Sequence, residues 1–112
     1  MSEAGFVAVL VIDLHFPESG SLKSKRKELS SIKAQLHGRL GAAVSEVAHH
    51  DLWQRATLTA ALTSGSLSSL ASATDRLERW LDARCPECVR VQRTVASVAE
   101  LHDLVPSLGG DG

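Results

Sequence analysis

The sequence has few of the residues that mark several protein classes. Its 112 residues include no tyrosine, two cysteines and three prolines. Two cysteines cannot form a disulfide framework, so a reducing cytoplasm is the expected location. The apolar run over residues 6–12 is too short to cross a bilayer, and no basic segment precedes it. We therefore expect neither a membrane anchor nor a signal peptide.

An excess of charge is also absent, because the formal net charge is −1. This balance excludes a protein coated with positive charge for nonspecific binding to nucleic acid. The bases are nevertheless concentrated, since residues 21–40 hold six bases and one acid, whereas the rest holds six bases and twelve acids. We interpret this segment as a localised basic patch that either binds a particular partner or pairs with acids elsewhere on the protein.

Hydrophobic periodicity predicts the element order βαββαβ. The expected strands cover residues 6–16, 42–49, 53–63 and 87–97, and the expected helices cover residues 21–40 and 67–83. This order is typical of an α+β, ferredoxin-like sandwich, with a four-stranded antiparallel sheet and two helices on one face. Right-handed crossovers place the first and third strands in the centre. We predict one domain over residues 1–98 and a partly disordered C-terminal tail over residues 99–112.

This topology brings distant polar residues to one end of the domain. The first strand ends and the first helix begins at the same edge of the sheet as the turn between the second and third strands. The residues expected to converge there are the cluster Asp13, His15, His49, His50 and Asp51, together with Trp53, Arg55 and the bases at positions 23–27.

The first helix carries a basic stripe beside its apolar face. At about 100° per residue, the stripe spans roughly 20° to 140° and consists of Lys23, Arg26, Lys27, Lys33 and His37. The apolar residues of the helix span roughly 280° to 360°. Free N–H groups at the helix start would add to an anion site suited to phosphate. The predicted nucleic-acid or anion-binding residues are Lys23, Lys25, Arg26, Lys27, Lys33, Trp53 and Arg55. Lys25 lies nearest the apolar arc, and we expect its stem to follow the rim of the core.

An equally weighted alternative is that these bases only solubilise the surface or pair with Glu18, Glu46 and Asp51. Two further motifs carry weaker signals. His15, His49, His50 and Asp51 could bind a metal, but adjacent strand residues point to opposite faces, so histidines that merely hydrogen-bond are favoured. Cys85 and Cys88 form a lone C-x-x-C, for which two reduced thiols at a turn are the preferred interpretation.

The outer face of the predicted sheet lacks aromatic residues. Its central positions hold Val7, Val9, Val11, Thr57 and Thr59. Base stacking across the sheet, as in RRM domains, is therefore not expected. An apolar face of this kind favours a homodimer interface or a surface covered by the C-terminal tail.

Two segments resemble the YlxP-like family of bacterial domains of unknown function. They are Ser21-Leu-Lys-Ser-Lys-Arg, which follows Asp13-Leu-His-Phe-Pro, and Val44-Ser-Glu-Val-Ala-His-His-Asp-Leu-Trp-Gln-Arg-Ala. The resemblance covers about residues 6–96 and implies a ferredoxin-like fold. Genes of the family commonly neighbour those for translation initiation and ribosome maturation, which implies a role near RNA or the ribosome. The resemblance implies no catalytic residue. Acids that are common in the family are replaced in this sequence by Ser24 and Ala48.

The sequence thus favours a small, cytoplasmic, non-enzymatic protein that binds RNA or the ribosome through its basic helix, with no cofactor, metal or membrane partner. No serine lies in the Gly-x-Ser-x-Gly turn of a hydrolase. The alternative is a homodimeric protein-interaction or regulatory module whose basic helix meets an acidic partner. A third hypothesis, an enzyme or metal protein, would use the histidines and Asp51.

Overall fold

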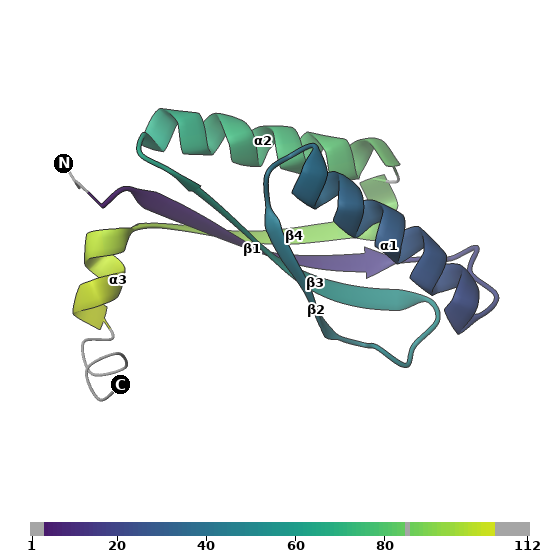
Figure 1. Cartoon of the computed structure of the whole chain (residues 1–112). Coiled ribbons are helices and arrows are strands. Elements are labelled where there is room, and N and C mark those ends of the chain that lie inside the picture. The colour runs from purple at the N-terminus through teal and green to yellow at the C-terminus, as the bar shows by residue number, and fades with distance from the viewer. Residues whose placement is uncertain (1–3, 85, 105–112) are drawn as a thin grey trace.

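The computed structural model describes residues 4–84 and 86–104. The elements follow the predicted order βαββαβ, with two short additions near the C-terminus (Figure 1). They are β1 (Phe6–His15), α1 (Leu22–Gly38), β2 (Ala43–Ala48), β3 (Arg55–Ser64), α2 (Leu67–Arg84), the 3₁₀ turn η1 (Pro86–Cys88), β4 (Val89–Ser97) and α3 (Val98–Leu104). The first part of the predicted tail thus forms α3, and residues 105–112 lie outside the described residues.

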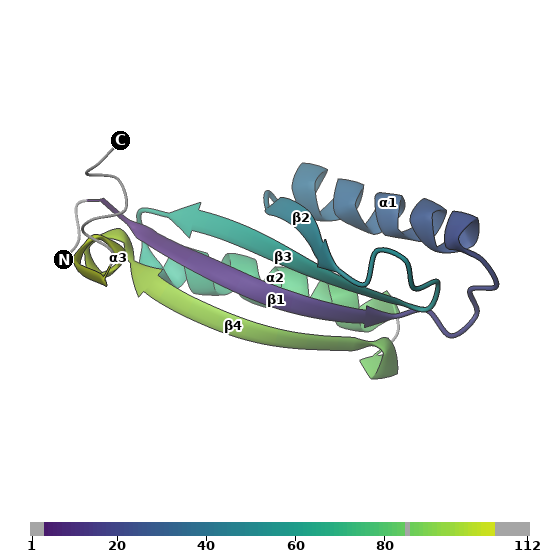
Figure 2. The same cartoon turned by 90° about the horizontal axis from the view of Figure 1, so that it is seen from below.

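The four strands form one antiparallel sheet in the order β2-β3-β1-β4. The central positions of β1 and β3 are those expected from right-handed crossovers. Both α1 and α2 lie on one face of the sheet, and within the described residues the other face carries no helix along its length (Figures 1 and 2). The predicted ferredoxin-like α+β architecture is therefore confirmed.

The core lies between the sheet and the two helices. Alternation along β1 and β3 turns every second residue toward the helices, and these residues are almost fully buried. The core residues of the two strands are Ala8, Leu10, Ile12, Leu14, Ala56, Leu58, Ala60 and Leu62, and the helices contribute Leu29, Ile32, Leu36, Leu70, Leu77 and Leu81. Each buried leucine or isoleucine stabilises the fold by about 1.5–3 kcal/mol.

Local signals fix both ends of α1. The Ser21 hydroxyl accepts a hydrogen bond from the Ser24 amide at 3.1 Å, which caps the first turn. At the other end Gly41 has a φ of +73°, and its amide donates to the His37 carbonyl at 3.2 Å. A left-handed glycine of this kind commonly terminates a helix.

The connection between β2 and β3 is longer than the sequence predicts. A register shift between Glu46 and Ala48 disturbs the end of β2, and His49 then adopts a φ of 64°. The Leu52 amide donates to the His49 carbonyl at 3.2 Å and closes a turn. As a result β3 begins at Arg55, and the prediction that Trp53 lies on this strand is wrong.

Within residues 4–84 and 86–104, no helix is both long enough and apolar enough to span a membrane.

Candidate nucleic-acid interface

The predicted bases of α1 do not share one environment. Lys23, Arg26 and Lys27 are exposed, and Lys33 is half-buried. On the opposite side of the helix, Glu28 pairs with Arg84 of α2 across 3.7 Å. Since Glu28 faces α2 and the basic stripe lies about 100° or more around the helix from it, the stripe faces away from α2.

Lys25 departs from this stripe and from its predicted role. Its side chain is fully buried, at 0% exposure, among the leucines of α1. The ammonium donates to the carbonyl oxygens of His49 at 2.7 Å and Leu52 at 2.6 Å. The His50 carbonyl lies at 3.5 Å, and a Glu46 carboxylate oxygen lies at 3.7 Å.

These contacts correct the expectation that Lys25 binds an anion or reaches the rim of the core. Three backbone carbonyls and one carboxylate surround the ammonium, so its hydrogen-bonding capacity is used inside the protein. A buried charge is tolerated only when it is paired and hydrogen-bonded in this way. Lys25 therefore holds the β2–β3 connection against α1 and is not available to a ligand.

The same contacts bring the basic helix start and the tryptophan-bearing connection together. Lys25 joins the second turn of α1 to the turn at residues 49–52. The Phe16 amide donates to the Gln54 carbonyl at 2.7 Å, which ties the segment after β1 to the same connection. Both views show the start of α1 beside the β2–β3 connection (Figures 1 and 2).

Trp53 lies between these two anchored residues and is 51% exposed. Val47 and Leu52 in the same hairpin are also about half exposed. Three apolar side chains of the hairpin are thus about half exposed. We call the combination of Lys23, Arg26, Lys27 and Trp53 the helix–hairpin surface.

Arg55 lies on a different surface from the α1 bases. Its pairing partner across the sheet is His15, and both residues fall on the helix-free face. Two residues back along β1, Asp13 accepts a hydrogen bond from the Thr57 hydroxyl at 2.8 Å. A hollow of about 440 Å³ on this face is lined in part by Asp13, His15, Arg55 and Arg90. Arg90 was missed, although alternation along β4 places it opposite Asp13.

His49, His50 and Asp51 form the turn itself. The carbonyls of both histidines face Lys25, so the turn's backbone serves the buried ammonium. Across residues 4–84 and 86–104, no three histidine, cysteine, aspartate or glutamate side chains are grouped as metal ligands would be. The structure therefore brings the segments of the predicted edge cluster together without assembling a ligand set from them.

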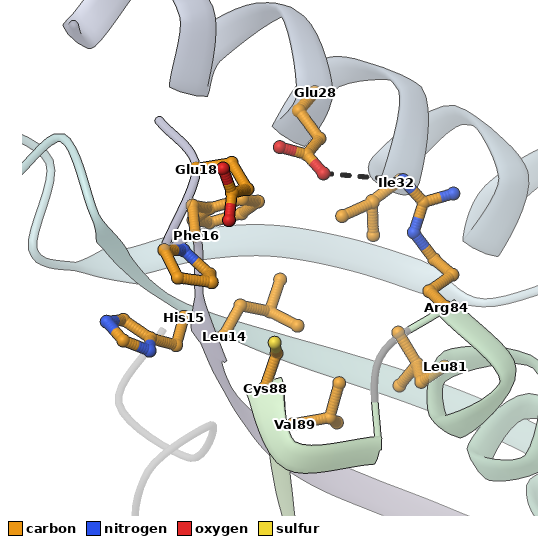
Figure 3. Close-up of a pocket in the computed structure, with 11 residues that line it drawn as sticks. Leu14, His15, Phe16, Glu18, Glu28, Ile32, Leu81, Arg84, Cys88 and Val89 are labelled. Atoms are coloured by element: carbon orange, nitrogen blue, oxygen red, sulfur yellow. Dashed lines mark ion pairs between the residues drawn. The ribbon is translucent and has the colours of Figure 1, made fainter. Parts of the chain in front are cut away.

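A second hollow, of about 380 Å³, lies at the end of β1 between α1 and α2 (Figure 3). Leu14, Ile32 and Leu81 contribute to its apolar lining, and the Glu28–Arg84 ion pair crosses it (Figure 3). The sequence gives no direct signal for this hollow, because it depends on how far the two helices diverge.

Cys88 borders both hollows. It is disulfide-bonded, so the expectation of a reduced thiol at this turn is wrong. Cys85 lies outside the described residues, and nothing in the candidate interface depends on either cysteine.

Taken together, the fold defines a ferredoxin-like domain with a basic helix clamped to an exposed hairpin. Among solved structures, a de novo designed protein, Foldit4, shares this fold with a TM-score of 0.52 and 10% identity over 81% of this chain and 94% of that chain. At this identity the likeness concerns the fold alone.

The family follows from the sequence comparisons. A family model described as "Protein of unknown function (DUF503)" matches residues 7–95, and the chain belongs to this family. The "Uncharacterized protein YlxP" of Bacillus subtilis (strain 168) is 30% identical over 78 residues, which is 70% of this chain and 80% of that protein. The resemblance to YlxP-like domains is thereby confirmed.

Proposed function

We propose that this protein is a non-enzymatic RNA-binding protein of the cytoplasm, acting in translation or ribosome maturation through the helix–hairpin surface. The observation that carries the proposal is that the α1 bases differ in exposure. Lys25 is buried against the hairpin, whereas Lys23, Arg26 and Lys27 are exposed. Within the described residues, these three bases form no ion pair.

The alternative that the bases pair with acids is met at one base, because Glu46, one of the three expected partners, lies 3.7 Å from the Lys25 ammonium. It does not account for Lys23, Arg26 and Lys27, which form no ion pair within the described residues. The first turn of α1 holds no acid, so bases there lie unopposed near the positive end of the helix dipole. This placement costs a few tenths of a kcal/mol for each base. A phosphate ligand would offset this cost by contributing the missing negative charge.

The test compares two charge-reversed variants in an RNA-binding titration. Lys23/Arg26/Lys27→Glu reverses the proposed site. Arg76/Arg79/Arg90→Glu is the matched control, because it makes the same change in net charge at three exposed bases outside α1. We expect the first variant to lose RNA binding and the control to keep it. Equal losses in both would show that overall charge, rather than this surface, is responsible.

Salt dependence provides a second measurement on the unmodified protein. If three phosphates are neutralised, a plot of log affinity against log salt concentration should have a slope of about −2 for single-stranded RNA. Binding to an acidic protein but not to RNA would instead support the interaction-module alternative.

A homodimer remains a second proposal, and it concerns the helix-free face. Along β1, one of the two central strands, this face carries a row of half-buried apolar residues, Val7, Val9 and Val11. A symmetric partner would cover this row. Light scattering should then show a dimer that Val9→Asp converts to a monomer. A wild-type monomer at high concentration would contradict the proposal.

A further inference from the structure

We infer that the RNA bound by the helix–hairpin surface is single-stranded, with one unpaired base stacked on Trp53. The inference rests on the proposed function and names its ligand more closely. It assigns the aromatic ring to base recognition and the bases of α1 to the phosphates of the same strand.

The two tryptophans of the chain differ in their surroundings. Trp80 packs against the core, and the Arg84 guanidinium lies 5.4 Å from the centroid of its ring. Trp53 is 51% exposed, and in the described part of the chain no cation lies over its ring. A large aromatic surface left in water loses the stabilisation that burial would provide. A ligand that covers the ring recovers it.

The backbone around Trp53 is held on both sides. The preceding carbonyl, of Leu52, accepts from Lys25 at 2.6 Å, and the following carbonyl, of Gln54, accepts from the Phe16 amide at 2.7 Å. The ring is thus carried by a fixed stretch of chain rather than by a free loop. Preorganisation of this kind lowers the entropy that a ligand must remove on binding.

This arrangement favours a single strand over a duplex. Bases inside a duplex are stacked on one another and cannot cover an indole ring, whereas unpaired bases can. Surfaces that bind single strands commonly combine such a ring with cations along the backbone. Lys25 joins these two parts here, because it lies in α1 between Ser24 and Arg26 while it bonds the residue before Trp53. Lys25 therefore acts as a positioning residue.

The chain has two tryptophans, so the variant Trp80→Phe leaves Trp53 as the sole tryptophan. We would titrate this variant with a short single-stranded RNA of mixed sequence and with the duplex formed by that RNA and its complement. Stacking of a base should quench the emission of Trp53 with the single strand, but not with the duplex. In the reciprocal variant Trp53→Phe, the emission of Trp80 should not change with either RNA.

Affinities measured in the otherwise wild-type chain do not depend on the folding of Trp80→Phe. Trp53→Ala should weaken single-strand binding between about fivefold and a hundredfold, and leave duplex binding unchanged. Leu67→Ala is the control, because Leu67 is 52% exposed at the start of α2, outside the surface. This control should bind both RNAs as the wild type does.

The outcomes separate the two proposals. Salt-dependent binding of both RNAs with equal affinity, unaffected by Trp53→Ala, would overturn the stacking inference and leave the proposed function standing. If the wild-type protein binds neither RNA, both proposals fail. Binding of the single strand with loss of affinity in both Trp53→Ala and Leu67→Ala would also overturn the assignment to Trp53.

Discussion

One cation ties α1 to the β2–β3 connection and another ties α2 to β4, and the two cations lie in opposite environments. Lys25 of α1 is fully buried and bonds carbonyls of the β2–β3 connection. Arg93 of β4 lies near the surface and bonds Asp75 and Glu78 of α2, both at 2.8 Å. The hydrogen bond that Arg93 donates to Asp75 is the largest of the causes that raise the pKa of Arg93.

The difference shows what each contact does for the fold. An ion pair open to water typically contributes about 0–1 kcal/mol, because water and salt screen it. A buried charge whose partners are left behind costs about 3–5 kcal/mol when it is removed. Since α2 is already held by buried leucines, Arg93 adds little to its attachment. The exposed hairpin has few buried side chains of its own, so Lys25 largely determines its position.

The largest effect should follow from removing the buried ammonium. Lys25→Met preserves the length of the stem but leaves the His49 and Leu52 carbonyls without their donor. We expect a loss of about 3–5 kcal/mol in the free energy of unfolding, measured in urea. Lys23→Met is the control, because Lys23 is exposed and its loss should cost less than about 0.5 kcal/mol. Equal effects of the two substitutions would refute the role given to Lys25.

A second prediction tests whether α2 is held by its apolar face. Leu77 is fully buried against the sheet. Leu77→Ala should lower the free energy of unfolding by about 2–5 kcal/mol, since it removes apolar contacts and leaves a cavity. Thermal and urea unfolding monitored by circular dichroism would measure the loss. If Leu77→Ala lowered the free energy of unfolding by less than a substitution of Arg93 does, core packing would not be the main attachment of α2.

Arg93 itself should matter far less. Arg93→Gln removes the charge while keeping a side chain of polar character, and we expect a loss below about 1 kcal/mol. The effect should shrink further in high salt, because exposed ion pairs are screened. Urea titrations at low and high salt concentration provide the measurement. A loss as large as that of Lys25→Met would show that screening does not govern this contact.

The sequence predicts those features of the fold that depend on hydrophobic periodicity. Alternation identifies the buried face of β1, and the helical spacing of Leu29, Ile32 and Leu36 identifies the buried face of α1. On the same helical projection Lys25 lies at about 300°, beside the leucines, but the preference of a charged group for water leads us to expect it at the rim rather than buried. Topology alone also places the helix start beside the hairpin.

The remainder depends on contacts between distant segments. The carbonyls that receive Lys25 converge only because His49 adopts a left-handed conformation, which no periodic pattern encodes. The same irregularity moves Trp53 off the strand. The hollow between α1 and α2 depends on the angle between the helices. By contrast, the start of α3 has a local signal in the sequence, since Ser97 and Glu100 have the spacing of a capping box.

That capping box gives the smallest predicted effect. The Ser97 amide donates to the Glu100 carboxylate at 2.9 Å, and the Ser97 hydroxyl accepts from the Glu100 amide at 3.1 Å. The backbone hydrogen bond from Ser97 is the main cause that lowers the pKa of Glu100 from its usual 4.5. Because the ionised form is the one stabilised, the contribution is complete above pH 4.5 and is lost as the pH falls through the lower pKa of the folded state.

The helicity of residues 98–104, followed by backbone chemical shifts, should therefore fall in acid before the sheet unfolds. Glu100→Gln cannot ionise, so its helicity should show no such step. A step of equal size in Glu100→Gln would place the titrating group elsewhere. Since Glu100 is fully exposed, the step should also weaken in high salt. The buried contact of Lys25 with the β2–β3 connection should not respond to salt in this way. Backbone chemical shifts of both regions, followed in one titration at low and at high salt concentration, would therefore distinguish the buried contact from the exposed one.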